Sequence, residues 1–237
     1  MRPRPQLVLL DVDFTLIRPH RVFDAQGYAE LGARFGARLD PERYEQARLD
    51  ALHIWRVGTL EHRSAQHRLF AVEIVRGMGA RQVEAEQIGI AAEEAWGDPS
   101  NFELFPDVER LLELLRASGC TVGLVSNTDR ELQAFVAQLG ISVDFALASR
   151  AHGRRKPCTT IFAAALALGG APAEAAVMVG DSLDDDIAGA VACGLRAILV
   201  DRHGRYPDHA GERVGGLAEL PRLLGLETTA ALPPAGA

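Results

Sequence analysis

Residues 7–16 read LVLLDVDFTL, four apolar residues that lead directly into a segment with two carboxylates. A strand of a parallel sheet is covered on both faces, so its residues are continuously apolar rather than alternating. Residues 7–10 therefore predict a buried parallel strand, which ends where Asp11 and Asp13 begin.

Comparable apolar runs recur along the 237-residue chain, and each main run ends at a polar or acidic residue such as Ser126 or Asp181. The runs are residues 122–125, 176–179 and 197–200, with a weaker candidate at 145–148. Segments whose apolar residues have helical spacing lie between these runs. Residues 108–115 show it after Pro106, and residues 132–139 show it with Thr128 or Asp129 as the expected N-cap.

This alternation predicts an α/β fold with a doubly wound, Rossmann-like parallel sheet. Ligand sites of such sheets lie at the carboxyl ends of the strands. Asp11, Ser126 and Asp181 would gather at that edge.

Residues 18–101 interrupt the alternation, because they contain helical spacing but no strand-like run. We expect them to form an inserted helical cap over the carboxyl edge of the sheet, where closure would exclude water. The expected core is residues 1–17 and 102–227. Residues 228–237, rich in Ala, Pro and Thr, are expected to form a flexible tail.

Composition narrows the class of protein. A formal net charge of −7 disfavours binding of nucleic acid over a broad surface. Three cysteines without CxxC spacing indicate neither a disulfide framework nor a zinc cluster, which fits a reducing cytoplasm. The first apolar run is too short for a signal peptide or a membrane span. Both a monomer and a homodimer remain open.

The strand ends carry residues suited to phosphoryl transfer, which needs a nucleophile, a cation over the phosphate oxygens and an acid for the leaving alcohol. Asp11 and Asp13 could divide such tasks, although an isolated DxD is usually a solvated turn. A hydroxyl and backbone amides at Ser126 and Asn127 could donate to a phosphate, or could serve as a helix cap. Lys156 offers a point charge for phosphate, and Pro157 is expected to start the next helix.

Residues 180–186 read GDSLDDD and precede an expected helix at residues 187–191. Four carboxylates in six positions repel one another unless they are solvated or neutralised, and hard oxygens suit Mg²⁺. Asp184 is also explained by the preference of helix N-termini for acids. The stretch therefore favours a metal site.

In order, DVDFTL, SNTD, RKP at residues 155–157 and GDSLDDD resemble the four motifs of the haloacid dehalogenase superfamily. The resemblance runs from Leu7 to about Asp201, and the helical insertion is similar in position to that family's C1-type cap. Phe14 stands where the family commonly has glycine, and Cys158 where an aspartate often follows Lys-Pro.

The resemblance implies a Mg²⁺-dependent hydrolase acting on a small phosphorylated metabolite. Asp11 would be the nucleophile that forms an aspartyl-phosphate, and Asp13 the acid that protonates the leaving group and then activates water. The residues implied for phosphate binding are Ser126, Asn127 and Lys156, and those implied for Mg²⁺ are Asp11, Asp13 through its carbonyl, Asp181 and Asp186, with Asp185 as a neighbour.

Alternatives remain at this point. A phosphomutase of the same superfamily uses the same residues, and a non-catalytic protein that binds a phosphate ligand would be expected to have lost one of them. A dehalogenase is disfavoured by Asp13, because halide departure needs no acid. His62 and His67 are five residues apart, so they are expected at the surface rather than as a metal pair.

Overall fold

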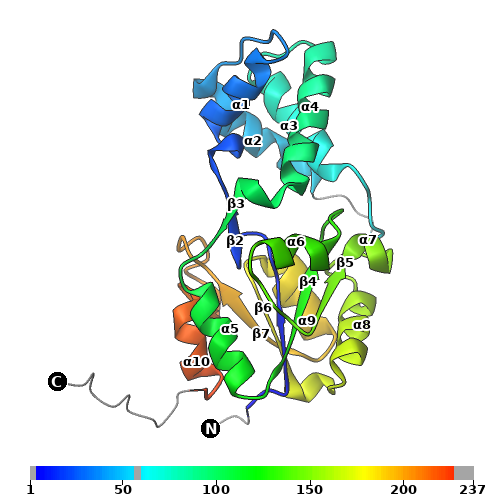
Figure 1. Cartoon of the computed structure of the whole chain (residues 1–237), viewed down its shortest axis with the longest axis vertical. Helices are drawn as coiled ribbons and strands as arrows, with labels where there is room; N and C mark the ends of the chain where they lie inside the picture. The colour runs from blue at the N-terminus through cyan, green and yellow to red at the C-terminus, as the bar shows by residue number, and fades with distance from the viewer. Residues whose placement is uncertain (1–3, 56–59, 227–237) are drawn as a thin grey trace, which may run out of the picture.

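The computed structural model describes residues 4–55 and 60–226. A helical part stands above an α/β part, and a short two-stranded ribbon joins them (Figure 1). The larger sheet has six parallel strands in the order β5-β4-β1-β6-β7-β8, which confirms the predicted fold class. These strands are β1 (Leu7–Leu10), β4 (Thr121–Ser126), β5 (Phe145–Ala148), β6 (Ala176–Gly180), β7 (Arg196–Val200) and β8 (Glu212–Val214).

Strand β1 lies at the centre of the sheet, and its four residues have no exposed surface. Alternate side chains of β1 point to opposite faces, so Val8 and Leu10 join one apolar cluster and Leu7 and Leu9 another. Both faces are therefore covered, as the continuous apolar run predicted.

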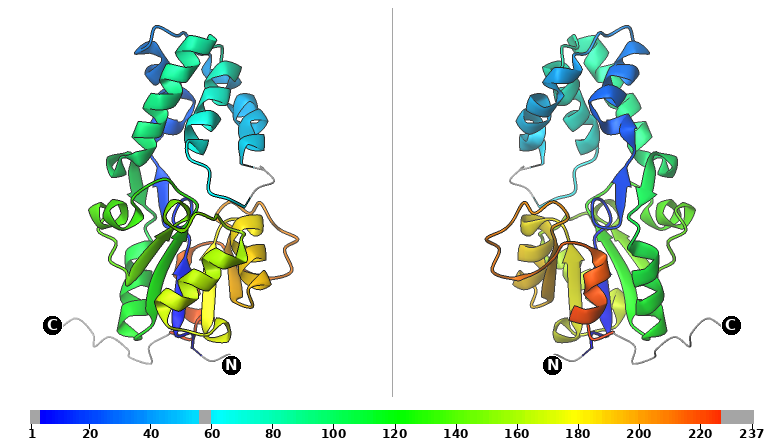
Figure 2. Two further views of the ribbon diagram at one scale, coloured as in Figure 1. Left: turned by 90° about the vertical axis from the view of Figure 1, so that its right-hand side faces the viewer. Right: turned by 90° about the vertical axis from the view of Figure 1, so that its left-hand side faces the viewer.

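Helices pack on both faces of the sheet (Figure 2), which is the doubly wound arrangement. One face is covered by α5 (Val108–Ala117), α6 (Leu132–Gln138) and α10 (Leu220–Leu223), and the other by α8 (Thr159–Gly169) and α9 (Gly189–Ala192). The remaining short turns of the core are α7 (Ser149–His152), η5 (Ala173–Ala175), η6 (Leu183–Ala188) and η7 (Leu217–Glu219).

Three predicted helix starts are wrong. Helix α6 has Glu131 as its N-cap rather than Thr128 or Asp129, because the Glu131 side chain accepts from the Ala134 amide. Helix α8 begins after the N-cap Cys158, so Pro157 precedes it. The acidic loop forms the π-helix η6 before α9, where a regular helix over residues 187–191 was expected.

The cap has an apolar cluster of its own, built by its four longer helices. Its elements are η1 (Arg21–Phe23), α1 (Ala25–Ala33), η2 (Pro41–Arg43), α2 (Tyr44–Ala51), η3 (Leu52–Ile54), α3 (Gln66–Gly77), α4 (Gln82–Gly97) and η4 (Pro99–Asn101). Helices α3 and α4 approach closely at Gly89, where a Cβ would lie 2.4 Å from the Val72 side chain.

The antiparallel ribbon of β2 (Ile17–Pro19) and β3 (Phe102–Leu104) lies at both predicted junctions between core and cap. The sequence did not reveal this ribbon, because three residues per strand are too few to show a period. The domain boundaries themselves stay a prediction, and residues 228–237 lie outside the described residues. Within the described ranges, every helix is too short or too polar to span a bilayer.

Candidate active site

The strand register brings the sequence-predicted carboxylates to one edge of the sheet. Leu10 pairs with Leu124 of β4 and with Val179 of β6, so β1 ends one residue before β6 and two residues before β4 at the same edge. The Asp11 amide donates to the Val179 carbonyl at 2.9 Å, which fixes the first residue after β1. By this register Asp11 lies level with Val125, one residue before Ser126, the buried last residue of β4.

Asp11, Asp181 and Asp186 each place a carboxylate oxygen within 4.8 Å of the other two. Glycine at position 180 makes this possible, because a Cβ there would lie 2.2 Å from Oδ2 of Asp186. The Ser182 amide donates to that same oxygen at 3.0 Å and holds Asp186 against the strand end. Asp11 and Asp186 are both buried.

Lys156 joins two of these carboxylates. Its Nζ donates to Oδ1 of Asp11 at 2.6 Å, to Oδ1 of Asp186 at 2.6 Å and to the Val125 carbonyl at 2.7 Å. The side chain is buried, and it is the only lysine among the 25 basic residues counted as Lys or Arg. A compact ammonium makes these three bonds in different directions, which a planar guanidinium cannot do.

Burial and charge shift the pKa values of this cluster. Burial lowers the pKa of Lys156, but the Asp11 and Asp186 carboxylates raise it more, so Lys156 stays charged. Burial and then the Asp11 and Asp186 charges raise the pKa of Asp181 to about 8. Burial raises the pKa of Asp186 to about 7, although Lys156 opposes that shift.

The donor set fits a hard divalent cation. The three carboxylates of Asp11, Asp181 and Asp186 face two cations, the buried Lys156 ammonium and the exposed Arg205 guanidinium at 3.5 Å from Asp181, so negative charge is in excess where the carboxylate oxygens converge. Carboxylate oxygens are the ligands that Mg²⁺ prefers, and a cation there would relieve the repulsion that raises the pKa of Asp181. Asp185 is not part of this set, because Arg155 and Asn127 both donate to its Oδ2 at 3.1 Å.

Asp13 is paired with Arg130, a residue that the sequence reasoning missed. Nη1 of Arg130 donates to both Asp13 oxygens, at 2.8 and 3.0 Å, and Nε donates to the Trp96 carbonyl at 2.9 Å. The guanidinium also lies 4.2 Å from the centre of the Phe135 ring. Burial raises the pKa of Asp13 despite Arg130. Arg130 directly follows SNTD, but nothing in the sequence indicates its partner.

The turn after Asp13 explains two further residues. Phe14 has a φ of 64°, a left-handed conformation that glycine adopts without cost, and the residue is 47% exposed. Thr15 turns back and donates from Oγ1 to Oδ2 of Asp11 at 3.1 Å. The two oxygens of Asp11 thus have different partners, Lys156 and Thr15.

Asn127 holds the lysine loop. Its Oδ1 accepts from the Lys156 amide at 2.7 Å, and its Nδ2 donates to the Lys156 carbonyl at 3.0 Å. These bonds set the position from which Lys156 reaches Asp11. The geometry gives Asn127 a role in orienting this loop, which the sequence reasoning did not foresee.

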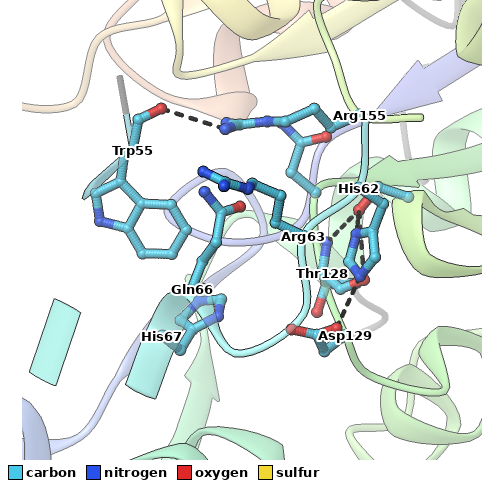
Figure 3. Close-up of a pocket in the computed structure, with 10 residues that line it drawn as sticks. Trp55, His62, Arg63, Gln66, His67, Thr128, Asp129 and Arg155 are labelled. Atoms are coloured by element: carbon cyan, nitrogen blue, oxygen red, sulfur yellow. Dashed lines mark hydrogen bonds and ion pairs between the residues drawn. The ribbon is translucent and has the colours of Figure 1, made fainter. Parts of the chain in front are cut away.

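A pocket lies between the cap and the edge of the sheet (Figure 3). It is lined by Trp55, His62, Arg63, Gln66, His67, Asn127, Thr128, Asp129, Ser149 and Arg155, and encloses about 10 Å³ of open space.

Two histidines of the pocket correct an expectation, because neither is a free surface side chain. His62 bonds Asp129 Oδ1 at 2.8 Å and Ser149 Oγ at 2.9 Å. His67 stacks on Trp96 with ring centres 4.6 Å apart, and burial lowers its pKa to about 3, so it is neutral.

Comparisons with known proteins agree with this geometry. Residues 5–194 match the family model described as haloacid dehalogenase-like hydrolase. A ribulose-1,5-bisphosphate 5-phosphatase of Halopiger xanaduensis is 32% identical over 237 residues, covering 90% of this chain and 98% of that protein. A phosphoserine phosphatase of Thermus thermophilus is 31% identical over 184 residues, covering 75% and 70%.

Among solved structures, a 2-haloacid dehalogenase of Pseudomonas syringae pv. Tomato aligns with a TM-score of 0.61 at 27% identity, over 95% of this chain and 99% of that one. The family match spans the segments that supply Asp11, Lys156, Asp181 and Asp186 to the cluster. This chain is therefore a member of the haloacid dehalogenase-like hydrolase family.

Proposed function

We propose that this protein is a Mg²⁺-dependent phosphatase that hydrolyses a small phosphomonoester through an aspartyl-phosphate on Asp11. The observation that carries the proposal is the convergence of Asp11, Asp181 and Asp186 around a buried lysine. Such a cluster supplies a nucleophile, a fixed positive charge and a cation site at one point.

In this proposal each side chain has one task. Lys156 and Thr15 hold the two oxygens of Asp11, so that one of them can be aimed at phosphorus. Lys156 stabilises the charge on the phosphoryl oxygens, together with donors at the end of β4 around Ser126. Mg²⁺, held by Asp11, Asp181 and Asp186 and by the Asp13 carbonyl, supplies further charge neutralisation when bound.

Asp13 supplies the proton for the leaving alkoxide and then removes one from the attacking water. A carboxyl whose pKa is raised by burial is a better proton donor near neutral pH than an ordinary aspartate. Arg130 donates one hydrogen bond to each Asp13 oxygen and holds the carboxyl in place, and each oxygen keeps a second lone pair that can carry the proton.

The relatives support this reaction class. The two named above are phosphatases of small phosphorylated metabolites, one a sugar bisphosphate and the other an amino acid phosphate. The solved dehalogenase points to the rival reaction, but displacement of halide from carbon has no use for an acid at Asp13 or for a cation at Asp181.

The test is phosphate release from a panel of sugar phosphates, a sugar bisphosphate, phosphoserine and p-nitrophenyl phosphate, with Mg²⁺ or with EDTA. Asp11→Asn is the test variant, and Asp184→Asn is its matched control because Asp184 is exposed in the acidic loop. We expect Mg²⁺-dependent release that Asp184→Asn retains and Asp11→Asn loses. Release that survives in Asp11→Asn would overturn the proposal.

A phosphomutase or a binding protein would give a different pattern. A mutase would convert one sugar phosphate isomer into another with little release of phosphate, which chromatography of the products detects. A binding protein would bind the panel compounds without converting any of them.

A further inference from the structure

The cap contacts the core a second time through residues 60–65, away from the β2–β3 ribbon (Figure 2). A bridge between Glu61 and Arg154 continues this contact. The segment is held by hydrogen bonds from Arg155 N to Leu60 O at 2.9 Å, His62 N to Gly153 O at 3.0 Å and Ala65 N to Asp129 Oδ2 at 3.2 Å, and by the His62 ring on Asp129 and Ser149. The backbone is therefore fixed on both sides of Arg63.

Arg63 itself makes no hydrogen bond or ion pair with any residue that the structure describes. Its side chain lines the pocket, and in Figure 3 it extends toward the same side as Arg155. Arg63 is exposed, so its guanidinium is free to contact a ligand that enters the pocket.

Arg155 has spare hydrogen-bonding capacity in the same pocket. Its Nη1 donates to the Trp55 carbonyl at 3.2 Å and its Nη2 to Asp185 at 3.1 Å. Its Nε is buried and has no partner among the described residues, although the side chain is 8% exposed. A buried donor without an acceptor costs free energy, so an acceptor is expected in the bound state.

Neighbouring acids do not neutralise Arg63. Asp129 already bonds the His62 ring and the Ala65 amide, and Asp185 already accepts from Arg155 and Asn127. Neither carboxylate therefore pairs directly with Arg63, and the residues that line the pocket include two arginines but one acid, Asp129.

The pocket shares a wall with the phosphate site. Asn127 lines the pocket and is bonded through both its side-chain atoms to the backbone of Lys156, which contacts Asp11. Two residues bonded to each other, Asn127 and Lys156, therefore connect the pocket to Asp11.

We propose that Arg63 and Arg155 bind a second anionic group of the substrate, a carboxylate or a second phosphate, so that the cap selects phosphomonoesters that carry two anions. This inference rests on the proposed phosphatase function. The open space of about 10 Å³ holds a single water, so the exposed Arg63 side chain has to move aside to admit the ligand before it contacts the second anionic group.

Two matched pairs of compounds test the proposal. Phosphoserine differs from phosphoethanolamine by its carboxylate, and fructose bisphosphate differs from fructose monophosphate by a phosphate. We expect wild type to prefer the compound with two anionic groups in at least one pair. The pair that shows the preference identifies the kind of anionic group that Arg63 and Arg155 bind. No preference within either pair would overturn the proposal.

Arg63→Gln should lower kcat/KM for the preferred compound by about 10- to 100-fold, mainly through KM, because a charge-assisted hydrogen bond is lost. For the compound with the phosphate as its one anionic group, kcat/KM should change by no more than about twofold. Arg63→Lys should restore part of the loss on the preferred compound. Arg38→Gln, which removes an exposed arginine elsewhere in the cap, is the charge-matched control and should leave both compounds unchanged. Equal losses of kcat/KM on both compounds of a pair in Arg63→Gln would contradict the assignment of Arg63 to the second anionic group.

Calorimetric binding of the same compounds to Asp11→Asn, with and without Arg63→Gln, separates this inference from the proposed function. If wild type releases no phosphate, yet Arg63→Gln selectively weakens binding of the compound with two anionic groups, the proposed phosphatase function is wrong and the anion site stands. If binding is indifferent to Arg63, the anion site is wrong.

Discussion

Replacement of Lys156 by methionine removes the positive charge that lies between Asp11 and Asp186, with little change in length. The ammonium makes three bonds of 2.6 to 2.7 Å in a site that excludes water. Without it, the buried Asp11 and Asp186 carboxylates lose their counter-charge, which raises the free energy of the folded state.

The expected cost follows from burial. Removing one partner of a buried ion pair destabilises a protein by about 3–5 kcal/mol. For a chain of this size each kcal/mol lowers Tm by about 2–4 °C, so Lys156→Met should lower Tm by about 6–20 °C in EDTA. Added Mg²⁺ should recover part of that loss, because it returns positive charge to the same carboxylates. Turnover should fall by at least about 10²-fold even at saturating Mg²⁺, because a fixed charge on the phosphoryl oxygens is lost.

Thermal unfolding followed by circular dichroism, in EDTA and in Mg²⁺, measures the stability effect, and phosphate release measures the activity. Arg205→Met is the control, since Arg205 is 54% exposed and lies 3.5 Å from Asp181, so its removal should cost little. A Tm in EDTA equal to that of wild type would refute the reasoning that Lys156 neutralises buried carboxylates.

Three further results are expected. Asp13→Asn should slow release of the alcohol from alkyl phosphates in the first turnover by about 10²- to 10⁴-fold, but should slow the first-turnover burst of nitrophenolate from p-nitrophenyl phosphate far less, because nitrophenolate leaves without a proton; equal losses in the first turnover would exclude Asp13 as the acid. In EDTA, the free energy of unfolding should fall as pH rises from about 4 to about 8. The pKa values of Asp186 and Asp181 are raised in the folded state to about 7 and about 8. The folded state therefore binds more protons than the unfolded state across that pH range. Denaturant titrations at several pH values should show this fall, and added Mg²⁺ should make it smaller. A free energy of unfolding that rises with pH over this range would contradict the prediction. Gly180→Ala should weaken Mg²⁺ binding measured by calorimetry, because its Cβ would lie 2.2 Å from Asp186 Oδ2 and displace that carboxylate; unchanged affinity would remove Asp186 from the cation site.

The core could be predicted from the sequence because its strands are buried on both faces and so are apolar without interruption. Strands β1 and β5 have the predicted bounds, and the polar residues after β1, β4 and β6 meet at one edge. Strand β8 escaped prediction, since it is an edge strand of three residues of which only Val214 is buried.

The partners within the site could not be predicted, because they depend on contacts between segments far apart in the sequence. Arg130 is 117 residues from Asp13, and its orientation also depends on Trp96 at the end of α4. His62 has no periodic pattern around it, and its two bonds come from core loops brought beneath the cap by folding. Sequence reasoning therefore found the residue types that carry the chemistry but not what orients them.

The most direct test of the central claim is chemical trapping of the phosphorylated nucleophile. Wild type mixed with substrate and Mg²⁺ is quenched in acid within one turnover, treated with borohydride and digested for mass spectrometry. An aspartyl-phosphate is reduced to a homoserine residue, whereas a free carboxylate is not. We expect that reduction at position 11 alone, with none in Asp11→Asn. Turnover by wild type with Asp11 unreduced, or with the reduced residue elsewhere, would contradict the account.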